Sequence, residues 1–165
     1  MEKYLTILPL ENSMEKEKLT YEKTKEKALR LLEFRSHSEF ELKQKLIRAG
    51  GTEIDKVLEF CREYNFLNDA DYAKKCAKDL QHLKKYGVRR IKDELSARGI
   101  ASELISEAIS ELETDEGDTL LPLMEKKLSG NFEKKNVDKA IRYFLYRGYG
   151  FSDINRCIDT LRNGE

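Results

Sequence analysis

The sequence predicts an all-α protein made of three tandem three-helix repeats, each helix-turn-helix-like, in an elongated, curved array of right or left hand. Of the 165 residues, 38% are charged, two are proline and none is tryptophan, which favours helix over strand. An apolar pair followed by a glycine also recurs every 49 residues. The copies are Leu42, Leu46 and Gly50; Ile91, Leu95 and Gly99; and Ala140, Phe144 and Gly148. One such unit cannot bury its apolar face alone, so the units must stack or share helices.

The segment 86–100 shows the recurring layout most clearly. Ile91 and Leu95 are four residues apart and lie on one face of a short helix. Gly99 is predicted to stop this helix and Gly87 to end the one before it, because glycine adopts the left-handed backbone of helix ends. The last helix of each repeat carries apolar residues at i, i+3, i+4 and i+7. These sets are Ile54, Val57, Leu58 and Cys61; Ile105, Ala108, Ile109 and Leu112; and Ile154, Cys157, Ile158 and Leu161.

The first repeat contains local signals for three helices. A charged helix is predicted from about Ser13 to Phe34, followed by a break at residues 35–38. Ser38 and Glu41 form a capping box for the second helix. Thr52 is predicted to cap the third.

In the second repeat, Asn68 or Asp69 is the predicted N-cap of the first helix. The apolar stripe of that helix is expected to consist of Ala73, Cys76, Ala77, Leu80 and Leu83.

The third repeat follows an acidic hinge at residues 113–118. Pro122 is placed in the first turn of the next helix, because proline is tolerated there. The second helix is predicted over 136–147, and Ser152 is predicted to cap the last helix. The domain limits are therefore an N-terminal tail at 1–12, which takes no assigned role, and repeats at 13–66, 67–114 and 115–165.

The net charge is zero, but the charges are unevenly distributed. Residues 1–66 are balanced, residues 67–99 carry +4, residues 100–125 carry −8 and residues 126–165 carry +4. Blocks of this size suit a partner that itself has patches of both signs. A neutral total argues against simple tight binding to duplex DNA, where phosphate neutralisation dominates affinity.

The sequence shows no constellation typical of an enzyme. It contains no glycine-rich phosphate loop and no Gly-x-Ser-x-Gly motif. His37 and His82 lie in different repeats, without metal-ligand spacing to the cysteines. Cys61, Cys76 and Cys157 are expected to be buried, reduced thiols of a cytoplasmic protein. No catalytic residue, metal or cofactor is therefore predicted.

The basic residues between Lys74 and Arg98 form the most distinctive candidate binding surface. Arginines matter most there, because a guanidinium pairs bidentately with carboxylate or phosphate. A solvated helix face is the alternative interpretation. Tyr149 and Phe151 are core residues or ligand contacts. The predicted partner-binding residues are Arg35, Lys74, Lys75, Lys78, Lys84, Lys85, Tyr86, Arg89, Arg90, Arg98 and Arg147.

Residues 1–10 include a short apolar piece, but Glu2, Pro9 and Glu11 do not fit a signal peptide. No apolar run approaches the roughly 20 residues of a membrane span. The sequence therefore predicts no membrane contact.

Four motifs, in this order, resemble the RecX family of bacterial regulators of the RecA recombinase, over residues 27–162. The first is Ala28-Leu-Arg-Leu-Leu-Glu-Phe-Arg35 followed by Ser38-Glu-Phe-Glu-Leu42 and Lys45-Leu46. The second is Phe66-Leu-Asn-Asp69 with Tyr72-Ala73. The third is Tyr86-Gly87, Arg90-Ile91, Glu94-Leu95 and Arg98-Gly-Ile100. The fourth is Arg147-Gly148-Tyr149 with Ile154. Each motif is weak alone, and their order on a 49-residue repeat makes the resemblance specific.

The resemblance implies that the protein binds in the groove of a RecA filament on single-stranded DNA. It also implies that the bound protein limits filament extension, ATPase, strand exchange and co-protease activity. The expected setting is DNA repair, recombination and the SOS response, and the chain is expected to be a monomer with at most a weak direct DNA contact. A curved, charge-blocked surface could bridge neighbouring protomers. The alternatives are a helical-repeat module that binds DNA directly and a scaffold for another partner.

Overall fold

The computed structural model describes residues 18–112 and 116–164, and these residues form nine helices and no strand. The first unit contains α1 (Tyr21–Phe34), α2 (Glu39–Arg48) and α3 (Ile54–Glu63). The second contains α4 (Asp69–His82), α5 (Val88–Ala97) and α6 (Ser102–Ser110). The third contains α7 (Glu116–Leu128), α8 (Lys134–Tyr146) and α9 (Phe151–Asn163). The predicted all-α fold of tandem three-helix repeats is confirmed.

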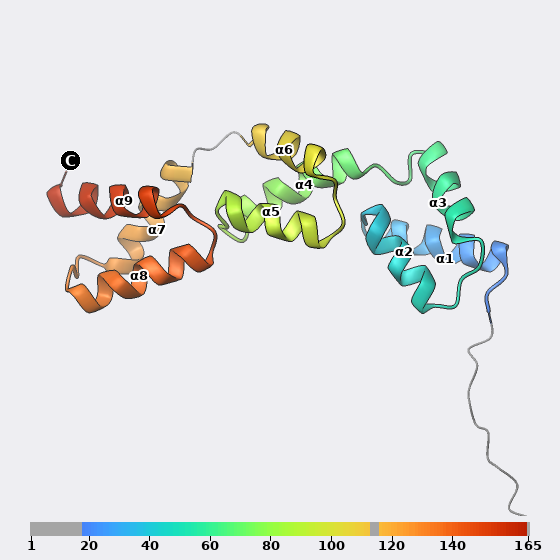
Figure 1. Ribbon diagram of the computed structural model, residues 1–165, viewed down its shortest axis with the longest axis horizontal. Helices are drawn as coiled ribbons and strands as arrows, with labels where there is room; N and C mark the ends of the chain where they lie inside the picture. The colour runs from blue at the N-terminus through green and yellow to red at the C-terminus, as the bar shows by residue number, and fades with distance from the viewer. Residues whose placement is uncertain (1–17, 113–115, 165) are drawn as a thin grey trace, which may run out of the picture.

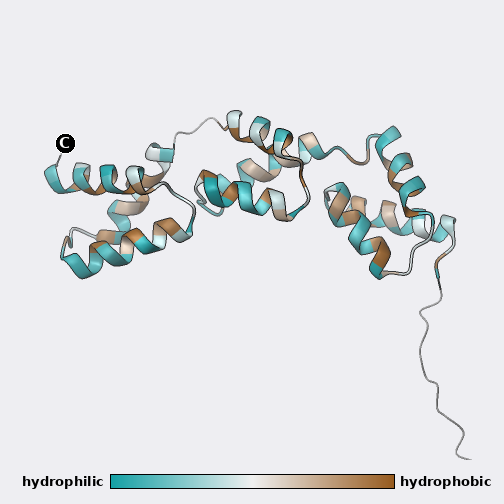
Figure 2. Ribbon diagram, viewed as in Figure 1, coloured by the Kyte–Doolittle hydropathy of each residue, from teal (hydrophilic) through white to brown (hydrophobic). Residues whose placement is uncertain are grey.

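Each unit encloses its own hydrophobic core, so the expectation that a unit cannot bury its apolar face without stacking or sharing helices is wrong. The apolar pairs that recur every 49 residues are buried in all three, as Leu42 and Leu46, Ile91 and Leu95, and Ala140 and Phe144. Hydrophobic residues lie where the three helices of a unit face one another, and hydrophilic residues follow the outer turns (Figure 2). Burial of these small cores is what stabilises each unit.

The three units lie in a row, which makes the molecule elongated (Figure 1). In this view α3, α6 and α9 follow one long edge, and α2, α5 and α8 follow the other. The second unit is displaced toward the first of these edges, so the row is bent. The domain limits predicted at 13–66, 67–114 and 115–165 remain predictions, and the tail at 1–12 and residues 113–115 of the predicted hinge lie outside the described residues.

Several local signals act as predicted. Ser38 and Glu41 form a complete capping box at α2. Asn68, not Asp69, caps α4 by accepting hydrogen bonds from the backbone N–H groups of Ala70 and Asp71. Gly99 ends the α5 segment with a φ of +75°, the left-handed conformation expected of a helix-terminating glycine.

Two predicted caps are wrong, because other residues take these positions. Thr52 does not cap α3, since its hydroxyl instead donates to the Leu19 carbonyl at 2.7 Å and holds the approach to α1. Glu53 precedes α3 with a φ of 47°. Ser152 does not cap α9 either, because the helix begins one residue earlier, at Phe151 after Gly150.

The prediction for Gly87 is also wrong. Its φ is −76°, and it precedes α5 as the N-cap residue, while Lys85 holds the left-handed conformation with a φ of 53°. Close packing is the reason that position 87 has no side chain, because a Cβ atom on Gly87 would lie 2.6 Å from the backbone of Gly148 in the next repeat.

In the third repeat, Pro122 lies inside α7 and not in its first turn, and residues 116–118 of the predicted hinge are helical. The second helix begins at Lys134, two residues before the predicted start. In the second repeat, Leu83 is not part of the buried stripe, because it follows the end of α4 and is 76% exposed.

Candidate interaction surface

The junction between repeats 1 and 2 is held by a polar network around Glu41. The Ser38 hydroxyl donates to the Arg98 carbonyl at 2.6 Å, which joins the start of α2 to the end of α5. The Tyr72 hydroxyl donates to Glu41 Oε2 at 3.1 Å and accepts from Arg98 Nη1 at 2.8 Å. Arg35 Nη1 lies 3.5 Å from Glu41 Oε2. These groups connect both repeats through one half-buried carboxylate.

The charge state of Glu41 follows from these contacts. Burial by itself raises the pKa of Glu41, but the Tyr72 hydroxyl, the Arg35 charge and the Ser38 amide together lower it below its ordinary value. Burial also raises the pKa of the Tyr72 phenol. Glu41 is therefore a stable anion that attracts both arginines.

The junction between repeats 2 and 3 uses backbone groups more heavily. The Gly87 N–H donates to the Arg147 carbonyl at 2.9 Å, and the Arg89 N–H donates to the Gly148 carbonyl at 3.3 Å. The Tyr149 hydroxyl donates to the Lys85 carbonyl at 3.1 Å. Tyr149 is buried, so of the two interpretations offered for it the core role holds.

Arg147 is oriented at this second junction by its neighbours. Its Nε donates to the Lys85 carbonyl at 3.3 Å, and its Nη2 donates to the Lys84 carbonyl. Its guanidinium lies 5.1 Å from the ring centre of Tyr86 and 5.4 Å from that of Tyr143. Cation–π contacts of this kind hold the arginine in one orientation.

The two junctions are equivalent, offset by 49 residues. The start of α2 contacts the loop after α5, and the start of α5 contacts the loop after α8. At each junction, a carboxylate at the start of one repeat's first helix accepts a hydrogen bond from a backbone N–H at the start of the preceding repeat's second helix. Asp69 accepts from the Glu39 N–H at 2.9 Å, and Glu116 accepts from the Val88 N–H. The spacing found in the sequence therefore describes how repeats join as well as how each repeat folds.

Within the described residues, the predicted binding residues divide into those held by contacts inside the chain and those that are exposed. Arg35, Arg98 and Arg147 take part in the junctions. Lys74 forms ion pairs with Glu107 and Glu111 of α6, at 2.7 and 2.8 Å, and their hydrogen bonds raise its pKa. Arg90 pairs with Glu94 at 2.9 Å and lies over the ring of Tyr86. The exposed remainder consists of Lys75, Lys78, Lys84, Lys85 and Arg89.

Several surface residues were not identified from the sequence. A cleft of 390 Å³ at the second junction is lined partly by Lys126, Lys127 and Tyr143, together with Lys85 and Arg147. Lys126 and Lys127 sit in a different helix from the basic segment that the sequence singles out. The two adjacent lysines are visible in the sequence, but whether they line a cleft depends on how repeats 2 and 3 pack against each other.

An aromatic cluster at the end of repeat 1 was also not identified. Phe60 and Tyr64 have ring centres 4.5 Å apart, and Tyr64 and Phe66 stack at 6.4 Å. Tyr64 and Phe66 are exposed, as is Phe151, which is therefore not a core residue.

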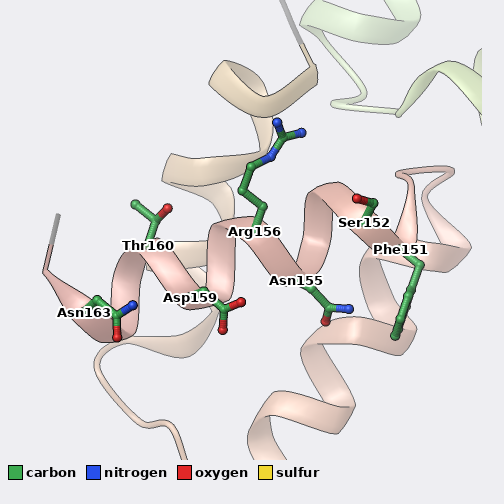
Figure 3. Close-up of a pocket in the computed structure, with 7 residues that line it drawn as sticks. All are labelled: Phe151, Ser152, Asn155, Arg156, Asp159, Thr160 and Asn163. Carbon is green, nitrogen blue, oxygen red and sulfur yellow. The ribbon is translucent and has the colours of Figure 1, made fainter.

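A hollow of 630 Å³ follows one exposed face of α9, between Phe151 and Asn163 (Figure 3). All the residues that line it belong to this single helix. It lies apart from the predicted binding residues, none of which lines it.

The described residues contain no cluster of His, Cys, Asp and Glu side chains suited to a metal ion. Cys61 and Cys157 are buried and Cys76 is half-buried, and all three are free thiols. Burial raises the pKa of each. Within the described part of the chain, no helix is long and apolar enough to cross a membrane.

Comparisons with solved structures support this architecture. The chain is similar to the crystal structure of RecX from Lactobacillus salivarius, with a TM-score of 0.76 and 23% identity over 86% of this chain and 96% of the other. It is also similar to a second crystal structure of a regulatory protein RecX, with a TM-score of 0.72 and 18% identity over 84% of this chain and 73% of that one. At these identities the likeness concerns the fold.

Sequence comparisons address the family. Residues 25–61 match the first three-helix domain of RecX, and residues 68–109 match the second. The regulatory protein RecX of Vibrio parahaemolyticus is 37% identical over 140 residues, which cover 82% of this chain and 89% of the relative. That of Clostridium perfringens is 36% identical over 152 residues, covering 87% of this chain and 70% of the relative. The chain therefore belongs to the RecX family of regulatory proteins.

Proposed function

We propose that this protein regulates the RecA recombinase, mainly as an inhibitor, by binding in the groove of the RecA filament on single-stranded DNA. Bound there, it limits filament extension, ATP hydrolysis, strand exchange and co-protease activity. Membership of the RecX family carries the proposal. A row of three helical units supports it, because an elongated body can contact several filament protomers at once, and simultaneous contacts multiply affinity.

The residues proposed to contact the filament are the exposed basic side chains of repeat 2: Lys75, Lys78, Lys84, Lys85 and Arg89. Arg35, Lys74, Tyr86, Arg90, Arg98 and Arg147 belong to the proposed surface mainly by shaping it, because they are held by contacts within the chain. The protein acts as a monomer in the cytoplasm, without catalysis of its own. A direct DNA contact is weak, because the chain has no net positive charge.

The test is the single-stranded-DNA-dependent ATPase of RecA from the same organism, titrated with this protein. We expect loss of ATPase at well below one protein per RecA. The double variant Lys78→Glu, Arg89→Glu should relieve the inhibition, because it reverses two exposed charges without removing an ion pair that the structure shows. Arg90 is unsuitable for this test, since its loss would also break the Glu94 pair.

The matched control is Lys134→Glu, Lys135→Glu, which makes the same change in net charge on exposed residues of α8. It should inhibit like the unaltered protein. Absence of inhibition across the titration by a folded protein would contradict the proposal. Binding to single-stranded DNA without RecA, falling steeply with salt, would point to a direct DNA binder instead.

A further inference from the structure

The cleft at the junction of repeats 2 and 3 carries an unbalanced positive charge. Its 390 Å³ is within the roughly 300–1,000 Å³ typical of ligand pockets. Four cationic side chains line it: Lys85, Lys126, Lys127 and Arg147. No carboxylate lines it among the described residues. Glu116, the carboxylate at this junction, is hydrogen-bonded to the Val88 amide and is not part of the lining.

The equivalent cleft at the junction of repeats 1 and 2 shows that this imbalance is not required by the fold. That cleft measures 210 Å³ and is lined by Asp79 as well as by Arg35, Lys75 and Arg98. Both arginines there also face Glu41, at 3.5 and 3.8 Å. The carboxylates of Asp79 and Glu41 therefore offset two of the three cationic charges at the first junction.

One charge reversal contributes to the difference between the clefts. Asp69 and Glu116 play the same part at the two junctions, which aligns α4 with α7 at an offset of 47 residues. The same offset places Leu123 where Cys76 stands, and each lines its cleft. It also places Lys126 where Asp79 stands. The second cleft thus has a lysine where the first has a carboxylate.

The lining of the second cleft indicates what kind of anion fits. Leu123 and Phe144 supply apolar side chains to this lining. The Tyr143 ring already has two cationic contacts, with Lys127 Nζ 4.2 Å and the Arg147 guanidinium 5.4 Å from its centre. A nucleobase that stacked on this ring would compete with these cations. A lining that combines apolar side chains with four cations instead suits a peptide in which carboxylates flank an apolar side chain.

We propose that this cleft binds an acidic segment of a protein partner, with Asp or Glu carboxylates on Lys126, Lys127 and Arg147 and an apolar side chain against Leu123. The inference rests on the proposed function in that it names the chemistry of the partner segment. Two cations of the cleft are preorganised, because two backbone carbonyls fix Arg147 and the Tyr143 ring holds Lys127. Preorganisation reduces the ordering cost of binding.

The probe is a fluorescein-labelled peptide of Asp and Glu residues with one central Phe, and the measurement is fluorescence anisotropy with the full chain. We expect saturable binding that weakens with added salt. The same peptide with Asn and Gln in place of the acids should not bind. The double variant Lys126→Glu, Lys127→Glu should lose at least about tenfold in affinity. Both lysines are exposed and form no ion pair within the described residues, so the variant should fold.

The control is again Lys134→Glu, Lys135→Glu in the same repeat. Lys134 is about 13 Å along α8 from Tyr143 and outside the cleft lining. This variant should bind the acidic peptide like the unaltered chain. An equal loss in both variants would reduce the effect to overall charge and overturn the proposal, as would equal binding of the neutral peptide.

A competition with single-stranded oligothymidylate separates the two classes of macromolecule. Displacement of the peptide by the oligonucleotide at lower concentration than by unlabelled peptide would make this a nucleic-acid site and overturn the proposal. The peptide assay contains no RecA. Failure of the RecA titration with intact peptide binding would therefore contradict only the proposed function, and failure of the peptide assay with intact inhibition would contradict only the cleft.

Discussion

Ser38 shows how one side chain serves both its own helix and the neighbouring repeat. Its Oγ accepts from the Glu41 N–H at 3.1 Å as the cap of α2 and donates to the Arg98 carbonyl at 2.6 Å. The hydroxyl is fully buried. Removing it would leave a carbonyl and an amide without this partner, and an unsatisfied buried polar group is costly.

We predict that Ser38→Ala lowers the free energy of unfolding by about 2 kcal/mol, the sum of a lost cap and a lost hydrogen bond between repeats. The matched control is Thr20→Ala, because Thr20 caps α1 from an exposed position, and within the described residues its hydroxyl bonds to the Lys23 N–H of its own helix and to no other repeat. This control should cost about 1 kcal/mol or less. Urea denaturation followed by circular dichroism measures both. Equal costs would mean that the bond to Arg98 adds nothing.

His37 is the second residue whose burial has a measurable consequence. It is 97% buried, since only 3% of its surface is exposed, and its Nδ1 donates to the Arg35 carbonyl at 2.8 Å. Its Nε2 has no hydrogen-bond partner among the described residues. Burial lowers the pKa of His37 most, and the Arg35 and Lys45 charges add to this, against the opposing effect of the Arg35 carbonyl and Glu41.

The lowered pKa predicts a loss of stability on acidification. The unfolded chain takes up a proton on this imidazole at about pH 6.5, while the folded protein resists protonation until a lower pH. The contribution to stability is thus complete above about pH 6.5 and is lost as the pH falls through the folded pKa. His37→Asn should flatten the dependence of unfolding free energy on pH between about 7 and 5, whereas His82→Asn, at an exposed site, should retain it. A pH dependence of the unfolding free energy that persists in both variants would originate from a group other than His37.

At the scale of the helices, local sequence signals predict what lies within about one turn of them. The capping box at Ser38, the Asn68 cap and the stop at Gly99 needed no tertiary information. Thr52 and Gly87 could not be assigned in this way, because their roles depend on residues far away in the sequence. Thr52 binds Leu19, and Gly87 faces Gly148 of the next repeat.

The same limit applied to the candidate site. Arg98 and Arg147 were identified as basic side chains suited to binding, and their positions 49 residues apart were visible. Their attachment to the neighbouring repeat was not visible, because the contacts span about 60 positions, as between Ser38 and Arg98. Lys126 and Lys127 were missed since their approach to Arg147 depends on the packing of α7 against α8.

The glycines after α7 and α8 give a test at this scale. Both have positive φ, +76° at Gly130 and +91° at Gly148. A Cβ at Gly130 would meet nothing within 4 Å, whereas a Cβ at Gly148 would lie 2.3 Å from the backbone nitrogen of Arg90. Gly130→Ala should cost about 1 kcal/mol of backbone strain. Gly148→Ala should cost about 1–3 kcal/mol more, because the start of α5 must move away.

Thermal unfolding by calorimetry compares these two variants directly. A second reading is proteolysis of the folded chain, which should increase near the second junction only in Gly148→Ala. If both alanines lower the midpoint equally, the close approach between Gly148 and Arg90 is not a stabilising feature of the junction.

At the scale of the whole molecule, equivalent junctions give the three units a defined succession. Each core is made from residues of a single unit, so a unit does not need its neighbour to bury its apolar face. The junctions add hydrogen bonds and close contacts at glycines, and these set the orientation of neighbours. Stability in such an array is close to a sum over repeats and their interfaces.

This separation predicts the outcome of removing repeat 3. A chain ending at Leu112 keeps the cores of repeats 1 and 2 and should retain their helical circular dichroism. If filament binding uses the full length of the row, the truncated chain should need at least about tenfold more protein for half-inhibition of the RecA ATPase, because simultaneous contacts are lost. The intact Lys134→Glu, Lys135→Glu variant controls for charge removed with α8. An unchanged half-inhibition point would place the inhibitory contacts in repeats 1 and 2 alone, and binding along the whole row would then be wrong.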